Sequence, residues 1–318
     1  MPAITVEDLK TLPTWARPGP ASQPRSAWSV VTAPTTLEGE GFQVRRAFPN
    51  QELPSADPFL LLDHLGAVEY APGEAKGAPD HPHRGFETVT YIIDGAIEHK
   101  DSTGGGGLIS DGDTQWMTAG AGIVHSELPP EYLVRAGGLF HGVQLWVNLP
   151  RVDKWAPPRY QDLQATGLTL LASHDGGTLF RLIAGDFGDH RGPGRTYTPI
   201  LYAHATIAPD ALLEVPWPAD YNSFVYVLTG EGSVGAGQRP IREGQIAVLG
   251  GGDHVMVRAS ARQPQATSSL EVLVLGGKPI REPVVFYGPF VMNTRDEIIE
   301  AVEDYQAGRM GHIPAARA

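Results

Sequence analysis

The chain has 318 residues, of which 42% are hydrophobic and 19% charged, as in ordinary globular proteins, and its length favours two domains. Its 24 basic and 36 acidic residues give a formal net charge of −12, which disfavours direct binding to the phosphates of nucleic acids. The absence of cysteine excludes disulfides, thiolate metal sites and cysteine nucleophiles. No stretch approaches the ~20 apolar residues of a membrane span, and the N-terminus has no apolar core like that of a signal peptide. We therefore predict a cytoplasmic protein that binds neither membranes nor nucleic acids directly.

Short apolar runs separated by turn residues predict an all-β chain. Two examples are FETVTYIIDGAIEH and LISDGDTQWM, in which Asp94-Gly95 and Asp111-Gly112 read as hairpin turns. In chain order we predict a poorly ordered, proline-rich tail (1–26), an N-terminal barrel (27–150), a linker or crossover (151–177), a C-terminal barrel (178–292) and a helix with a short tail (293–318).

The predicted helix lies in the sequence NTRDEIIEAVEDYQAG. Thr294 and Glu297 have capping-box spacing, and Gly308 suits the C-terminal stop. One apolar stripe consists of Ile298, Val302 and Tyr305. This pattern predicts a helix that packs on the rest of the protein.

The two strand-rich halves resemble one another. Superimposing VTYIIDG on VYVLTG aligns Gly95 with Gly230. The glycines eight residues apart in each half then also align, Gly112 and Gly120 with Gly244 and Gly252. This weak internal repeat predicts two tandem β-barrels of similar plan.

Two pairs of potential metal ligands occur in the first half. His81 and His83 are separated by one residue, as are His125 and Glu127. On a strand, residues i and i+2 point to the same face, so two neighbouring strands would bring all four side chains together. Three imidazoles and one carboxylate suit Fe(II), Ni(II), Mn(II), Cu(II) or Zn(II). A single strand histidine is more often a surface or core residue, but two such pairs favour a metal site.

The second half lacks these ligands. Counting from its turn glycines places Pro216 and Pro218 at the positions of the first pair, and Val257 and Ala259 at those of the second. The nearby His254 has no partner of this kind. We therefore predict one metal ion per chain.

The sequence resembles the pirin family, a branch of the cupin superfamily. The resemblance rests on HPHRGFETVTYIIDG and TAGAGIVHSE, and extends over most of the chain through DPFLLLDHLG, GVQLWVNLP and EPVVFYGPFVMNT. It implies a bicupin, with two tandem β-barrels of jelly-roll type and one iron-type site in the N-terminal barrel, whose ligands fall on His81, His83, His125 and Glu127. It also implies quercetin 2,3-dioxygenase activity, as in some members, or regulatory binding to transcription factors or metabolic enzymes, as in others.

Glu87 stands where ordinary cupins place a metal-binding glutamate, and in pirins this carboxylate is not a ligand. We predict that Glu87 instead orients a ligand histidine. Three other polar residues are candidates to face the pocket, although they could equally satisfy backbone groups at a barrel end: Asp63, His64 and Gln115.

Other features are predicted to be structural. Gly104–Gly107 reads as a flexible hairpin tip, because no lysine-bearing helix start follows to make a phosphate loop. His99 and Lys100 are predicted to face solvent. Three tryptophans are predicted to pack in the core or linker: Trp116, Trp146 and Trp155.

Two functions remain open. The first is an Fe(II)-type dioxygenase that cleaves a flavonol-like or other enol substrate with dioxygen, with Glu127 as the catalytic base that accepts the substrate proton. With quercetin the products would be carbon monoxide and an ester. The alternative is a regulatory protein whose redox-active metal controls binding to a protein partner. A structural zinc site is disfavoured, because such sites are usually rich in cysteine.

Overall fold

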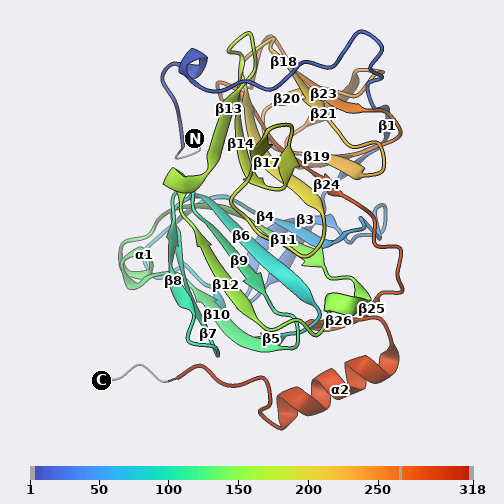
Figure 1. Cartoon of the computed structure of the whole chain (residues 1–318). Coiled ribbons are helices and arrows are strands. Elements are labelled where there is room, and N and C mark those ends of the chain that lie inside the picture. Colours follow the sequence, from blue (N-terminus) through green and yellow to red (C-terminus); the bar gives the residue numbers. More distant parts are fainter. Residues whose placement is uncertain (1–3, 265–266, 315–318) are drawn as a thin grey trace.

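The structure, a computed structural model, describes residues 4–264 and 267–314 and consists mainly of antiparallel strands in two halves (Figure 1). Each half contains a seven-stranded sheet and a four-stranded sheet. The two sheets of a half are not joined into one continuous hydrogen-bonded barrel, so each half is an open sandwich of jelly-roll type.

The first half occupies the lower part of Figure 1. Its large sheet has the order β12 (Arg159–Leu163), β9 (Thr114–Thr118), β6 (Phe86–Asp94), β11 (Gly138–Asn148), β4 (Phe59–Tyr70), β3 (Phe42–Phe48) and β2 (Thr35–Glu38). Its small sheet has the order β5 (Ala78–His83), β10 (Ile123–Leu128), β7 (Ala96–Asp101) and β8 (Gly106–Ser110).

The second half lies above the first. Its large sheet has the order β1 (Ala27–Thr32), β22 (Gln245–Leu249), β19 (Asn222–Thr229), β24 (Leu270–Gly277), β17 (Ile200–Ile207), β14 (Thr178–Ala184) and β13 (Thr169–Ala172). Its small sheet has the order β18 (Leu212–Pro216), β23 (His254–Ala259), β20 (Glu231–Val234) and β21 (Arg239–Arg242).

The remaining elements are short, apart from the C-terminal helix. Two small hairpins are formed by β15 (Asp186–Phe187) with β16 (His190–Arg191) and by β25 (Val285–Tyr287) with β26 (Phe290–Met292). The helices are η1 (Leu9–Thr11), α1 (Glu131–Ala136), η2 (Arg151–Asp153), η3 (Ala165–Gly167) and α2 (Arg295–Gln306). No helix among the described residues is long and apolar enough to cross a bilayer.

The predicted helix is α2, and its capping box is present. Thr294 accepts from the backbone N–H of Glu297, whose side chain accepts from the backbone of Thr294. Ile298 and Ala301 are buried, whereas Tyr305 is 41% exposed, so the buried face is narrower than the predicted stripe. The helix packs against the β25–β26 hairpin.

Both predicted hairpin turns connect different sheets. Gly95 and Gly112 have φ of +93° and +85°, which glycine adopts without strain. However, β6 before Gly95 belongs to the large sheet and β7 after it to the small sheet. The turns therefore mark the corners at which the chain crosses the sandwich.

The strand pairing corrects the predicted boundaries. Strand β1, expected in the first barrel, pairs with β22 of the second half. Strand β12, expected in the linker, pairs with β9 and forms an edge of the first half. Strand β13, also expected in the linker, pairs with β14 of the second half. The first half thus gains one strand and the second half two from outside their predicted segments, because an edge strand needs only an unpaired neighbour and enough chain to reach it.

The N-terminal segment is also more ordered than predicted over its described part, residues 4–26. Trp15 is 6% exposed, and its ring centroid lies 5.5 Å from that of Phe180 and 5.8 Å from that of Phe187. Prolines prevent a strand ladder here, but they do not prevent a large apolar side chain from packing.

The two large sheets pack face to face and form the principal core. This core includes Val89, Tyr91, Leu145, Tyr202 and Leu273. Strand β6 is therefore covered on both faces: one faces the second half and the other faces the interior of its own sandwich.

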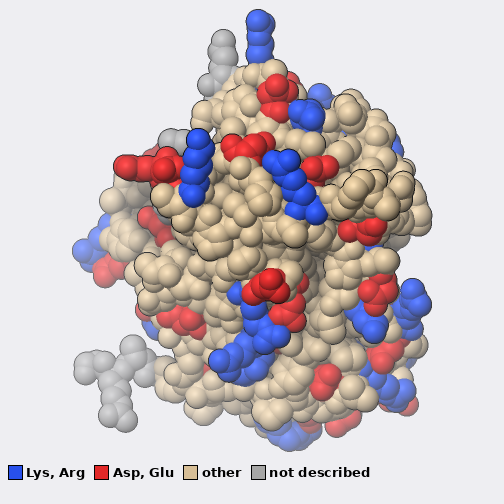
Figure 2. Space-filling model, turned by 45° about the horizontal axis from the view of Figure 1, so that its top comes forward, with Lys and Arg blue, Asp and Glu red and all other residues tan. Residues whose placement is uncertain are grey.

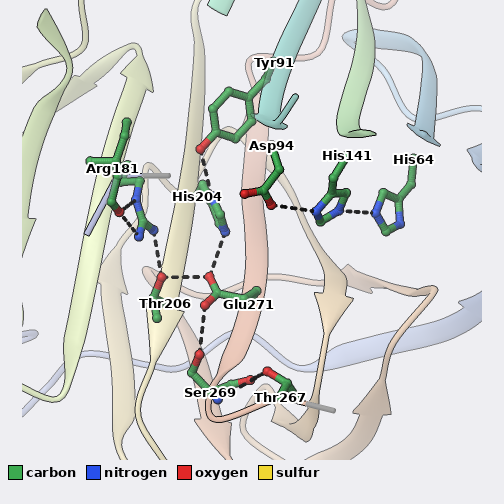
Figure 3. A network of polar contacts seen from close by, with 11 residues as sticks. His64, Tyr91, Asp94, His141, Arg181, His204, Thr206, Thr267, Ser269 and Glu271 are labelled. Atoms are coloured by element: carbon green, nitrogen blue, oxygen red, sulfur yellow. Dashed lines mark hydrogen bonds and ion pairs between the residues drawn. The ribbon is translucent and has the colours of Figure 1, made fainter. Parts of the chain in front are cut away.

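Buried polar residues cross this interface (Figure 3). The Tyr91 hydroxyl donates to Nδ1 of His204 at 2.9 Å, and Nε2 of His204 donates to Glu271 at 2.9 Å. Nearby, Nε2 of His64 and Nε2 of His141 are 2.8 Å apart. Burial lowers the pKa of His204 to about 4, so this imidazole is neutral near pH 7.

Candidate metal centre

Three histidines converge on neighbouring strands of the small sheet. Strands β5 and β10 are antiparallel, with His81 directly opposite His125. The potential ligand atoms of His81, His83 and His125 all lie within 4.8 Å of one another. The strand alternation on which the prediction depended therefore brings the three imidazoles together.

Each of these imidazoles has its Nδ1 atom engaged. The distances are 2.7 Å from His81 to the Pro79 carbonyl, 3.2 Å from His83 to the Pro289 carbonyl, and 3.4 Å from His125 to Nδ1 of His99. The Nε2 atom of His125 is buried and has no hydrogen-bond partner. Burial lowers the pKa of His83 to about 3 and that of His125 well below its usual value. Both rings are therefore neutral near pH 7, the state that binds a metal through Nε2.

Glu127 lies beside this group and is 4% exposed. A carboxylate oxygen of Glu127 lies within 4.8 Å of nitrogen atoms of His125 and His99. Glu127 is not part of the group formed by His81, His83 and His125. A register shift in the β5–β10 pairing falls between His125 and Glu127. The structure thus brings the three histidines together directly and places Glu127 next to His125.

Three neutral donors hold the Glu127 carboxylate. Oε1 accepts from Thr90 Oγ1 at 2.6 Å and from Gln115 Nε2 at 3.2 Å, and Oε2 accepts from Gln144 Nε2 at 2.8 Å. Gln115 was a sequence candidate, whereas Thr90 and Gln144 were missed. Each missed residue is a polar residue between two apolar ones inside a strand, Thr90 on β6 and Gln144 on β11, and that was the available signal.

A pocket of about 660 Å³ opens beside the site and is lined by His81, His83 and Glu127. Its apolar lining includes Leu61, Leu65, Ile97, Phe140, Trp146 and Phe286. The Trp146 ring is nearly parallel to the Phe286 ring, with an 8° angle and centroids 6.2 Å apart. Of the three tryptophans predicted to be structural, Trp116 is in the core, but Trp146 forms part of the pocket wall.

Asp63 also lines the pocket, but His64 and Glu87 do not. Glu87 accepts hydrogen bonds from Thr118 Oγ1 at 2.7 Å and Thr196 Oγ1 at 2.5 Å. The prediction that Glu87 orients a ligand histidine is therefore wrong. Its strand is buried on both faces, and Glu87 lies on the face opposite to that of Thr90.

His99 also differs from prediction. Its side chain is fully buried beside His125, whereas Lys100 is exposed as predicted. The alternation of Ile97, His99 and Asp101 with charged residues was a sequence signal for an inward-facing His99.

The interior of the second half is apolar. Leu213 pairs with Val257 and Val215 pairs with Val255, and all four side chains are in its core. On β18 the inward positions that correspond to His81 and His83 are therefore Leu213 and Val215, and the prediction of Pro216 and Pro218 is wrong. The prediction of Val257 on the neighbouring strand is correct. His254 contacts Ser22 and Asp253 instead. Among the described residues, groups of three potential ligands occur only in the first half.

The donor set fits a divalent transition metal. Three imidazoles whose Nδ1 atoms are already hydrogen bonded, together with a carboxylate, form a borderline to hard ligand set. The partnerless Nε2 of His125 is the specific observation in favour, because a buried polar atom without a partner is unfavourable unless something binds to it.

Comparisons with known proteins agree with this fold. Residues 41–147 match the family described as Pirin, and residues 202–311 match the family described as Pirin C-terminal cupin domain. The chain is 42% identical to a pirin-like protein of Solanum lycopersicum over 292 residues, covering 91% of this chain and 94% of the relative. It is 39% identical to human pirin over 277 residues, covering 86% of this chain and 90% of the relative.

A crystal structure of quercetin 2,3-dioxygenase from Acinetobacter baumannii superimposes with a TM-score of 0.84 at 36% identity, covering 91% of this chain and 99% of that one. The predicted all-β bicupin with a short C-terminal helix is thereby confirmed. The chain belongs to the pirin family.

Proposed function

We propose that the protein is an Fe(II)-type dioxygenase that acts on quercetin-like flavonols or other enol substrates. The main support is the convergence of three imidazoles, each with its Nδ1 atom in a hydrogen bond, at the wall of a pocket of about 660 Å³. Pockets of this size suit a drug-sized ligand. The relative from Acinetobacter baumannii bears the name of this activity.

The proposed metal ligands are His81, His83, His125 and Glu127. Fe(II) is the proposed ion, and the same donors would accept Ni(II), Mn(II), Cu(II) or Zn(II). When bound, the metal supplies Lewis acidity toward the substrate hydroxyl and a place where dioxygen and substrate meet.

Glu127 is the proposed base for the substrate hydroxyl. Its carboxylate lines the pocket and is held by Thr90, Gln115 and Gln144, all of which donate to it. These donors orient the carboxylate without neutralising its charge. It therefore remains able to accept a proton from a substrate in the pocket.

The pocket wall suits a flat aromatic substrate. Trp146 and Phe286 present nearly parallel rings, and Leu61 and Leu65 add aliphatic surface. An aromatic substrate that packs on this wall would be held in a fixed orientation while water is displaced from the site.

The test is metal analysis of protein purified under anaerobic conditions, followed by oxygen uptake with quercetin. We expect one equivalent of metal, and uptake that is lost on chelation and restored by adding Fe(II). A fully metallated protein without uptake on quercetin or related enols would contradict the enzyme proposal.

One observation favours the regulatory alternative. His83 is hydrogen bonded to Pro289, in the same hairpin as Phe286 and Tyr287, which are 44% and 66% exposed. Metal loading could therefore alter a surface that contacts another protein. Slower hydrogen exchange in residues 285–292 on metal loading, without oxygen uptake, would favour this function.

A protein partner is more plausible than a nucleic acid in that case. The net charge is −12, and acidic and basic side chains are interspersed on the face shown in Figure 2. Such a surface offers little attraction to a phosphate backbone.

A further inference from the structure

His99 and Asp101 lie next to the metal site without being among its proposed ligands. Both are on β7, which pairs with β10 so that His125 is opposite Asp101. Their side chains are fully buried. Burying an ionisable side chain costs free energy unless the side chain has a hydrogen-bond partner, so the partners of His99 and Asp101 matter.

Asp101 is fixed as a hydrogen-bond acceptor. Its Oδ1 accepts from the backbone N–H of Thr103 at 2.8 Å, from the Thr103 hydroxyl at 2.6 Å and from the backbone N–H of Gly105 at 3.0 Å. A Cβ atom on Gly105 would lie 2.5 Å from Oδ2 of Asp101. The glycine run therefore lets the loop close around this carboxylate, which gives a specific role to the predicted flexible tip.

The remaining oxygen of Asp101 orients His99. Oδ2 lies 3.3 Å from Nε2 of His99, and a carboxylate can only accept, so this Nε2 carries the proton. In a neutral imidazole protonated at Nε2, Nδ1 is a bare acceptor. The ring is also stacked on Tyr160, at 5.0 Å and 20°.

His99 in turn faces His125. Their Nδ1 atoms are 3.4 Å apart, so one of them donates and the other accepts. With His99 in its neutral form, Nδ1 of His99 is the acceptor and Nδ1 of His125 is the donor. His125 then holds its lone pair on Nε2, the buried atom without a partner. The backbone carbonyls of Pro79 and Pro289 have the corresponding role for His81 and His83.

We propose that Asp101 and His99 form a relay of positioning residues that fixes the Nε2 tautomer of His125 and strengthens it as a metal donor. A carboxylate behind a ligand histidine increases the basicity of the ligand, and here a second imidazole transmits the effect. The inference rests on the proposed metal site and adds two residues that its ligand set does not include.

The test compares four variants on the full chain: His99→Phe, His99→Gln, Asp101→Asn and the exposed neighbour Lys100→Gln as a control. Two quantities are measured, the dissociation constant for Ni(II) by chelator competition and the tautomer of His125 in metal-free protein by ¹⁵N NMR. The second does not depend on activity or on metal.

We expect His99→Phe to weaken Ni(II) binding by about 10–100-fold and to release His125 from a single tautomer. Gln at position 99 can donate to Asp101 and accept from His125, so His99→Gln should recover most of the affinity. The Ni(II) affinity of Asp101→Asn should lie between those of His99→Phe and His99→Gln, and that of Lys100→Gln should equal the wild-type value. Circular dichroism and gel filtration establish that each variant is folded.

The proposal is overturned if His99→Phe and Asp101→Asn bind Ni(II) as tightly as the wild type, or if wild-type His125 carries its proton on Nε2. If His99→Phe does not fold, the Ni(II) affinities of His99→Gln and Asp101→Asn still test the proposal, because His99→Gln is expected to bind more tightly. If the wild type binds no metal, the proposed function fails, whereas the His125 tautomer still tests the relay.

Discussion

Nδ1 of His83 donates a hydrogen bond to the carbonyl oxygen of Pro289, 206 residues further along the chain, at 3.2 Å. The adjacent Arg84 forms a 2.6 Å ion pair with Asp304 of α2. The C-terminal segment therefore orients a proposed ligand and is fastened beside it. Metal binding and the docking of this segment should influence one another.

The first prediction concerns the histidines. We expect His81→Ala, His83→Ala and His125→Ala each to lose the metal while the protein remains folded. The core between the halves consists mainly of apolar side chains and includes none of the proposed ligands, so folding and metal binding should be separable. Elemental analysis after gel filtration and circular dichroism provide the measurements. A variant that keeps one equivalent of metal removes its residue from the ligand set.

The second prediction separates the two glutamates. Glu127→Gln should reduce metal content and any oxygenase rate, because an amide oxygen is a weaker donor and cannot accept the substrate proton. It also replaces an acceptor with an NH₂ group facing the donors Thr90, Gln115 and Gln144. Metal analysis and initial rates test this prediction.

Glu87→Gln is the matched control. Glu87 contacts Thr118 and Thr196 on the opposite face of its strand, so metal content should be unchanged. The free energy of unfolding should fall by about 1–2 kcal/mol, because one hydrogen bond is weakened in a buried site. Loss of metal from Glu87→Gln, with full occupancy in Glu127→Gln, would mean that the chain uses the general cupin ligand set.

The third prediction concerns the aromatic wall. Phe286→Ala should raise the KM for an aromatic substrate up to about tenfold with little change in kcat, because an aromatic contact contributes roughly 0.5–1.5 kcal/mol. Tyr287→Ala is the control, since Tyr287 is exposed and does not line the pocket. Equal effects of the two substitutions would argue against a substrate contact at Phe286.

The fourth prediction concerns pH. The pKa of His204 is about 4 in the folded protein and about 6.5 when unfolded. Above pH 6.5 the ring is neutral in both states and contributes no pH dependence. As the pH falls from 6.5 to 4, only the unfolded state binds the proton, so the folded state is destabilised by roughly 3 kcal/mol.

Urea unfolding of metal-free wild type and His204→Gln between pH 4 and 7 measures this contribution. A glutamine can still donate to Glu271 and accept from Tyr91, but it does not titrate. The wild type should therefore lose more stability than the variant over this range. Parallel pH profiles would show that His204 does not titrate as described.

Local pattern alone predicted a large part of this protein. The i, i+2 spacing of His81–His83 and His125–Glu127 depends only on strand geometry, and the capping box at Thr294 depends only on neighbouring residues. The positive φ of Gly95 likewise follows from a turn that most side chains cannot adopt. Such features survive in any tertiary arrangement that keeps the strand, helix or turn.

Tertiary structure decided which buried face each side chain occupies. Strand β6 is covered on both sides, so alternation could not tell that Thr90 faces Glu127 while Glu87 faces the other half. The contact between His83 and Pro289 joins segments 206 residues apart, and no local pattern encodes it. The inward orientation of His99 could have been predicted from its alternation with Lys100. Its role, however, depends on the neighbouring strand, which brings Nδ1 of His125 to 3.4 Å from Nδ1 of His99.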